Sequence, residues 1–112
     1  MSAAGDCATA YFDRVRARDP AAIAGMFAED GRLTMPDGMV LVGRAVILDF
    51  YRAAFAKAPP TPRITRLISQ DDVCAAELSV TRANGSFVRV VDVFELGPDG
   101  LIVSLRIYRQ GS

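Results

Sequence analysis

A carboxylic acid stands in the middle of the most apolar strand that the sequence predicts. Residues 87–96 read FVRVVDVFEL, and an extended chain turns successive side chains to opposite faces. Asp92 therefore shares its face with apolar residues only, namely Val88, Val90, Phe94 and Leu96. A carboxylate on such a face loses its hydration, so it must be paired, hydrogen-bonded or kept protonated by a raised pKa. Buried carboxyl groups of this kind are frequent at functional sites, and Asp92 accordingly predicts a pocket.

Arg106 offers a second interpretation of Asp92. On a strand over residues 101–108, Arg106 alternates onto one face with Ile102, Ser104 and Tyr108. A buried ion pair with Arg106 would leave Asp92 ionised and purely structural. The other interpretation is a neutral Asp92 that donates a hydrogen bond into a pocket. The sequence leaves both interpretations open.

The absence of histidine narrows the possible chemistry. It excludes Ser-His-Asp and Cys-His relays, and it excludes imidazole ligands for zinc. Acid–base chemistry must then use Asp, Glu, Tyr, Lys or Cys side chains. The sequence also lacks both common glycine-rich nucleotide-binding motifs. We therefore expect neither a cofactor nor a metal ion.

The charge balance and the cysteines indicate the class of partner and the compartment. Thirteen basic and thirteen acidic residues cancel, so no global field attracts nucleic acid or an anionic membrane. The first ten residues do not resemble a secretory signal, and no apolar stretch is long enough to span a bilayer. Cys7 and Cys74 are far apart in the sequence, as expected of free thiols in a reducing compartment. We expect a cytoplasmic protein without nucleic-acid or membrane partners.

The elements that must position Asp92 follow from the apolar periodicity. Helices are predicted over residues 4–18, 20–27 and 44–57. Strands are predicted over 32–34, 39–42, 63–69, 73–82, 87–95 and 101–108, with turn residues between them. Pro59, Pro60 and Pro62 should end the third helix and form a stiff connector. One α+β domain over residues 1–112 is expected, with three N-terminal helices packed on a curved antiparallel sheet.

Three local segments, together with this order of elements, resemble a known superfamily. They are residues 24–31 (AGMFAEDG), 42–51 (VGRAVILDFY) and 92–106 (DVFELGPDGLIVSLR). They resemble the NTF2-like superfamily, which includes the SnoaL-like and ketosteroid-isomerase-like proteins. The resemblance spans nearly the whole chain and implies a cone-shaped fold around a cavity. It says less about activity, because the superfamily includes isomerases, cyclases, epoxide hydrolases and non-catalytic association domains.

Within the superfamily, the sequence is most similar to bacterial ketosteroid isomerases, which hold the steroid oxyanion with a tyrosine and a protonated aspartate. Tyr11 resembles the first-helix tyrosine, Tyr51 the third-helix tyrosine that supports it, and Asp92 the neutral acid. The aspartate that moves the proton in those enzymes corresponds to Met35, whose thioether cannot accept a proton. Asp37, in a Pro-Asp-Gly turn two residues later, is either a replacement base at the cavity or an ordinary turn residue.

Three functions remain open on this resemblance. In an isomerase, Asp37 would move a proton while Tyr11 and Asp92 stabilise a dienolate. A ligand-binding protein would keep the same donors without a base, and an association domain would have a vestigial cavity. An epoxide hydrolase is less well matched, because Val90 stands where that class has an arginine.

The expected ligand is a small, largely apolar molecule that carries a carbonyl or hydroxyl oxygen. The cavity walls would contain the following residues: Tyr11, Val15, Phe27, Met35, Phe50, Tyr51, Val90, Asp92, Phe94, Arg106 and Tyr108.

The opposite face of the 87–96 strand predicts a protein partner. Arg89, Val91 and Val93 alternate onto this face. An antiparallel sheet with that much apolar surface on its second face is expected to be covered. We expect a homodimer that forms through this open face.

Overall fold

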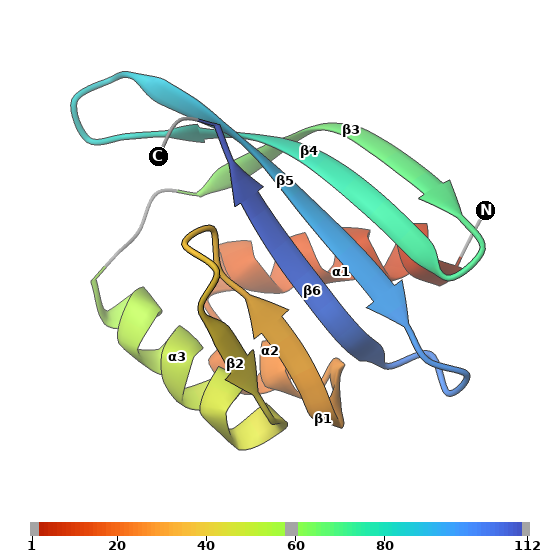
Figure 1. Cartoon of the computed structure of the whole chain (residues 1–112). Helices are drawn as coiled ribbons and strands as arrows, with labels where there is room; N and C mark the ends of the chain where they lie inside the picture. Colours follow the sequence, from red (N-terminus) through yellow and green to blue (C-terminus); the bar gives the residue numbers. More distant parts are fainter. Residues whose placement is uncertain (1–2, 58–60, 111–112) are drawn as a thin grey trace.

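The computed structural model describes residues 3–57 and 61–110, and it shows a six-stranded sheet with helices on one of its faces (Figure 1). The elements of the first half are α1 (Ala3–Ala17), α2 (Pro20–Ala24), β1 (Phe27–Thr34), β2 (Val40–Val42) and α3 (Arg44–Ala56). Those of the second half are β3 (Pro62–Gln70), β4 (Val73–Thr81), β5 (Phe87–Leu96) and β6 (Ile102–Arg109). Among the described residues, no helix is long and apolar enough to cross a membrane.

The predicted α+β class is confirmed, but two details of the expected architecture differ. Only α1 and α2 precede the first strand, and α3 lies mid-chain after the β1–β2 hairpin. The strands are ordered β2-β1-β6-β5-β4-β3, and β1 pairs with β6 in parallel. The sheet is therefore mixed. A parallel pair needs a long crossover, which α3 and strands β3 to β5 provide here. The connector predicted at Pro59 and Pro60 lies outside the described residues.

The second helix is shorter than the predicted 20–27, because the chain already enters strand β1 at Phe27. Asp19 caps α2 by accepting a hydrogen bond from the Ala22 backbone N–H at 3.1 Å, as its position before a proline suggests. The helix ends at Ala24, and the chain enters β1 at Phe27. The pairing of β1 with β6 then shifts register between Phe27 and Arg32. A side chain on Gly31, inside this irregular stretch, would place its Cβ 2.9 Å from a backbone oxygen of β6.

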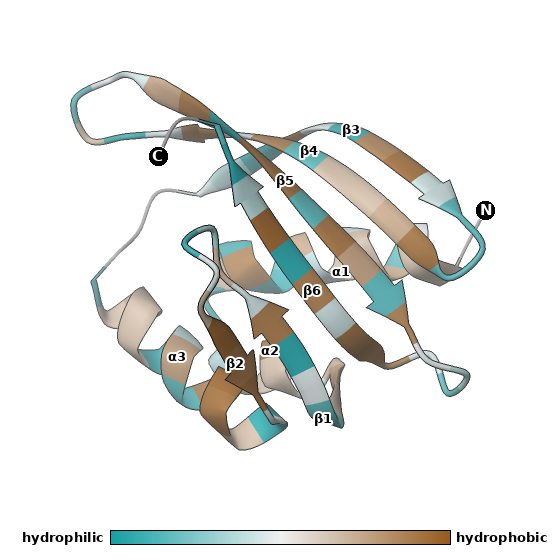
Figure 2. Cartoon of the chain, in the orientation of Figure 1, coloured by the Kyte–Doolittle hydropathy of each residue, from teal (hydrophilic) through white to brown (hydrophobic). Residues whose placement is uncertain are grey.

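The core fills the space between the helices and the sheet. α1 packs on β3, β4 and β5, whereas α3 packs on β1 and β2. Figure 2 shows hydrophobic residues on β2 and early in α3, and polar and apolar residues alternating along β6. The largest fully buried side chains come from all three helices and from the strands: Phe12, Ile23, Phe27, Leu33, Ile47, Phe94, Ile102 and Leu105.

A one-residue irregularity in β6 changes which of its side chains face the helices. Leu96 of β5 pairs with Ile102, but the preceding Glu95 pairs with Ser104. Val103 therefore has no partner of its own on β5. Such a bulge moves every later side chain of the strand to the face opposite to the one that simple alternation predicts.

Two predicted cavity residues are displaced by this shift. Leu105 and Ile107 turn toward the helices, with Leu105 fully buried. Arg106 and Tyr108 instead lie on the open face of the sheet, where Tyr108 is 54% exposed. The prediction that Arg106 and Tyr108 line the cavity is therefore wrong.

Candidate functional site

Two buried tyrosines from different helices share a hydrogen bond. Tyr11 comes from α1 and Tyr51 from α3, and both are almost fully buried. Their hydroxyl groups are hydrogen-bonded to each other, and either one can be the donor. Burial is the largest cause that raises the pKa of both hydroxyls, so both stay protonated at physiological pH. The pair links the two helices over the sheet and offers a protonated oxygen in an apolar setting.

Asp92 lies on β5 close to this tyrosine pair. Its side chain is only 4% exposed, and its Oδ1 atom is buried without a hydrogen-bond partner among the described residues. Burial raises the pKa of Asp92 from 3.8 to about 7. A charge on Asp92 in turn raises the pKa of Tyr11 and of Tyr51, so the three groups are near enough to interact. The prediction that Asp92 is buried on the apolar face is confirmed.

The alternative partner of Asp92 is excluded by the geometry. Arg106 donates hydrogen bonds through Nη1 to Glu95 and, at 3.2 Å, to Ser104 Oγ. The hydrogen bond with Glu95 is the largest cause that raises the pKa of Arg106. On β6, the residue opposite Asp92 is Ile107. Arg106 therefore belongs to an ion pair on the open face, and the predicted Asp92–Arg106 pair is wrong.

A pocket of about 310 Å³ opens on the helix side of the sheet, and neither Asp92 nor the two tyrosines are among its lining residues. Its apolar walls are Met35 and Pro36 after β1, with Val80, Val88, Val90 and Ile107 from the sheet. Arg82 and Arg109 complete the lining. Val90 is two residues from Asp92 on the same face of β5. Ile107 on β6 is the cross-strand partner of Asp92. Two lining residues, Val90 and Ile107, are thus neighbours of Asp92 in the sheet, although Asp92 itself is buried behind them.

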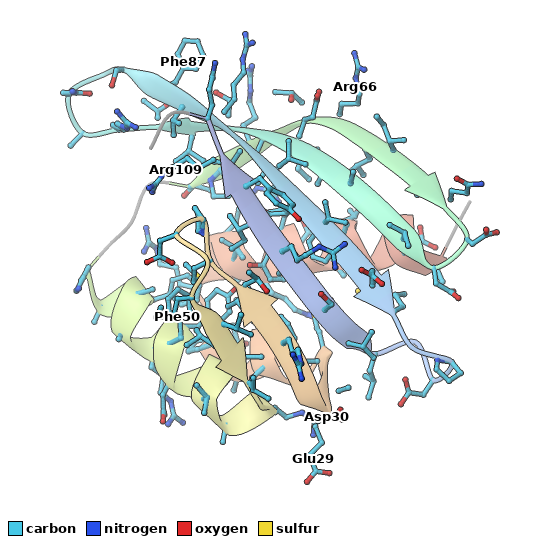
Figure 3. All side chains as sticks on the ribbon, viewed as in Figure 1. Glu29, Asp30, Phe50, Arg66, Phe87 and Arg109 are labelled. Atoms are coloured by element: carbon cyan, nitrogen blue, oxygen red, sulfur yellow. The ribbon has the colours of Figure 1, made fainter. Side chains whose placement is uncertain are left out.

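The other predicted cavity residues belong to the packed core beneath the tyrosines. Phe27 and Phe94 are fully buried, and the Phe94 ring lies 5.2 Å from that of Tyr11, centroid to centroid. Val15 and Phe50 are partly buried and pack against the same core. Figure 3 labels Phe50 between α3 and the β1–β2 hairpin. None of these four residues lines the pocket, whereas the predicted Met35 and Val90 do.

Asp37 serves the turn between β1 and β2. Its side chain is exposed, and Oδ1 accepts a hydrogen bond from the Met39 backbone N–H at 2.9 Å. Gly38 follows with a φ of 91°, a conformation that favours glycine in such a turn. Asp37 does not line the pocket, so the interpretation as a turn residue holds. In the described part of the chain, the pocket lining contains Met35 and no carboxylate.

The cavity walls predicted from the sequence lack six residues that line the pocket, namely Pro36, Val80, Arg82, Val88, Ile107 and Arg109. The predicted alternation of residues 101–108 turns Ile107 away from the cavity, because it does not include the bulge at Val103, and Arg109 lies beyond the end of that predicted strand. Arg82 follows β4 and continues the face of Val80, so the alternation along that hairpin could have indicated it.

The sequence pattern of the SnoaL-like domain matches residues 8–105 of this chain. The chain belongs to the SnoaL-like family. A steroid Δ-isomerase from Nocardioides simplex is 36% identical to this SnoaL-like protein over 113 residues. That alignment covers 96% of this chain and 91% of the relative. The predicted resemblance to the NTF2-like superfamily is thereby confirmed.

Solved structures show the same fold. A candidate ketosteroid isomerase from Kribbella flavida superposes with a TM-score of 0.83 at 24% identity, over 98% of this chain and 79% of that one. The epoxide hydrolase/cyclase-like enzyme SalBIII, which acts in pyran ring formation in the polyether salinomycin, superposes with a TM-score of 0.73. It is 27% identical and the match covers 93% of this chain and 88% of SalBIII. The fold is therefore shared by proteins with different chemistry.

Proposed function

We propose that this SnoaL-like protein binds a small, largely apolar molecule through a carbonyl or hydroxyl oxygen. That oxygen accepts hydrogen bonds from Tyr11 and from the protonated carboxyl group of Asp92. The observation that carries the proposal is the buried, unpartnered Oδ1 of Asp92. Leaving such a group without a partner costs about 1–3 kcal/mol, and a ligand oxygen at this position would remove the penalty.

The tyrosine pair supports the same assignment. When Tyr51 donates to Tyr11, the proton of Tyr11 is free to point at a ligand. Both hydroxyls lie in an apolar environment, where a hydrogen bond is stronger than in water. A ligand in the pocket would contact Met35, Val90 and Ile107, and these side chains would have to shift for its oxygen to reach the buried Asp92. Met35 is unbranched and flexible, so its side chain can yield to a ligand.

Binding without turnover accounts better for the pocket than proton transfer does. A general base must lie within hydrogen-bond reach of the proton it removes. The carboxylate of Asp37 is engaged in its turn, and Met35 cannot act as a base. Proton-transferring isomerisation is the second candidate function, favoured by the 36% identity to a steroid Δ-isomerase.

Titration with a planar phenol and its deoxy analogue tests the proposed donors. The phenol should bind roughly tenfold or more tightly, because each buried donor without an acceptor costs about 1–3 kcal/mol. Tyr11→Phe and Asp92→Leu should each remove most of this preference and leave the affinity for the hydrocarbon largely unchanged. Asp37→Asn, at the exposed turn, is the matched control and should keep the full preference. Equal affinities of the wild type for the two compounds would contradict the proposal.

An isomerase assay separates the two candidate functions. The substrate is a β,γ-unsaturated ketone, whose conversion to the conjugated isomer is followed by absorbance. We expect binding without measurable turnover. Turnover by the wild type that falls about 10²–10⁴-fold in Asp37→Asn would instead establish an isomerase that uses this aspartate as its base.

A further inference from the structure

Two arginines without acidic partners border the pocket beside Asp92. Arg82 and Arg109 line it together with its apolar walls. Among the described residues, neither guanidinium forms an ion pair or a side-chain hydrogen bond. The pocket lining described above contains no aspartate or glutamate, so its charge is positive and uncompensated.

The strand register places both arginines nearer than Asp92 to the end of the sheet that carries the β4–β5 hairpin. Arg109 pairs with Val90, one step along the sheet from the pair of Asp92 with Ile107. Arg82 lies at the β4–β5 hairpin, where its backbone N–H bonds to the Ser86 carbonyl. At about 3.3 Å per residue, these levels lie roughly 7 Å and roughly 20 Å from that of Asp92. A ligand about as long as two or three fused rings can therefore reach from the level of Asp92 to that of Arg109, and Arg82 would approach its end only through its own long side chain.

Arginines on the opposite face of the sheet provide a comparison. There, Arg66 pairs with Glu77 and Arg106 pairs with Glu95, each across neighbouring strands. Figure 3 shows Arg66 pointing away from the helices, whereas Arg109 lies on their side of the sheet. Arg66 and Arg106 each have a carboxylate partner on the neighbouring strand, whereas the pocket lining provides none for Arg82 and Arg109. An anion supplied from outside would take their place.

We propose that the ligand of this pocket is an amphipathic organic acid whose carboxylate is held by Arg82 and Arg109. This inference rests on the proposed function and names the class of its ligand. The oxygen-bearing end of the molecule reaches Tyr11 and Asp92, and the apolar middle contacts Val80, Val88 and Ile107. A planar guanidinium matches a carboxylate with two parallel hydrogen bonds, which favours a carboxylate over a neutral polar group. The apolar walls reduce screening by water and strengthen the attraction.

A hydroxybiphenyl carboxylate and its neutral primary amide form a matched pair of probes. At low ionic strength the wild type should bind the acid roughly tenfold more tightly than the amide, and added salt should reduce this ratio. The double variant Arg82→Gln/Arg109→Gln should bind both probes with equal affinity, and its affinity for the amide should match that of the wild type. Arg52→Gln, an exposed arginine on α3, is the control and should keep the preference for the acid.

A third probe, biphenyl carboxylate without the hydroxyl group, separates this inference from the proposed function. If it binds as tightly as the hydroxylated acid and depends on both arginines, the carboxylate site stands and the buried donors are refuted. If the wild type binds acid and amide equally, or if Arg52→Gln loses the preference as the double variant does, the carboxylate site is overturned. Retention of the preference in the double variant would also overturn it.

Discussion

Asp92 couples the stability of the fold to pH in the opposite sense to a salt-bridged aspartate. Burial raises its pKa from 3.8 to about 7, so the folded protein retains a proton that the unfolded chain releases between these values. The unfolded state then binds fewer protons than the native state, and the free energy of unfolding falls as the pH rises. The contribution is fully present below about pH 4 and is lost as the pH rises through about 7.

The variant Asp92→Asn should remove this pH dependence, because asparagine has nearly the same shape and does not titrate. At about 1.4 kcal/mol per unit of pKa, the wild type should lose several kcal/mol between the two pKa values. Urea unfolding of both proteins at several pH values from about 5 to about 8 measures the effect. All other titrations are common to the two proteins, so the difference between their curves isolates Asp92. Parallel curves would show that Asp92 is ionised in the native state across this range.

Bulges decide which parts of the strands can be predicted from the sequence. β4 and β5 pair without interruption, and simple alternation places Asp92 on its buried face correctly. In β6 the same reasoning fails after Val103, where the register shifts. A bulge depends on how two strands pair, and the alternating pattern of one strand does not record that pairing. The predicted cavity face of Arg106 and Tyr108 is consequently wrong.

The resemblance predicted the buried side chains of the site correctly, whereas the sequence did not decide the role of Asp37. The side chains of Tyr11, Tyr51 and Asp92 come together as the resemblance implies, although they come from three distant segments. Asp37 could not be decided from the sequence, because a Pro-Asp-Gly turn fits both a base near the cavity and a turn residue. Only its hydrogen bond to the Met39 backbone distinguishes the two.

Arg44 joins the beginning of α3 to the beginning of β1, a contact that local sequence patterns do not reveal. Its Nε and Nη2 atoms both donate to the Phe27 carbonyl oxygen, at 3.1 and 2.7 Å. Phe27 stands where the register of β1 with β6 begins to shift. The guanidinium thus satisfies a backbone acceptor at an irregular point of the sheet and fixes the helix that carries Tyr51.

Replacing Arg44 with methionine should destabilise the protein by about 1.5–3 kcal/mol, the typical value of a hydrogen bond to a charged group. Methionine keeps a similar length and apolar stem, so the loss reports the donors. Equilibrium unfolding in urea measures it. Arg52→Met on the exposed side of the same helix is the control, and its effect should stay within about 0.5 kcal/mol. Equal stabilities of the two variants would mean that the contact to Phe27 does not stabilise the fold.

The molecule as a whole has one covered and one bare face of its sheet. The helices cover the face that carries Asp92, whereas the opposite face carries the ion pairs of Arg66 and Arg106. Exposed apolar side chains accompany these pairs on the bare face, including Ile68 at 56% and Tyr108 at 54% exposure. Apolar surface of this kind, interspersed with charged groups, is typical of a protein–protein interface.

We expect the protein to form a homodimer through this bare face. A second copy would bury the apolar side chains and place ion pairs at the rim of the interface. Sedimentation velocity at micromolar concentration should show a dimer for the wild type. Ile68→Glu adds a charge at an exposed position of β3 and should shift the protein toward the monomer with its circular dichroism spectrum unchanged. Met39→Glu, at the similarly exposed β1–β2 turn, provides the control, and it should remain dimeric. A wild type that sediments as a monomer would contradict the dimer. If both variants dissociated equally, the interface would not be specific to the bare face.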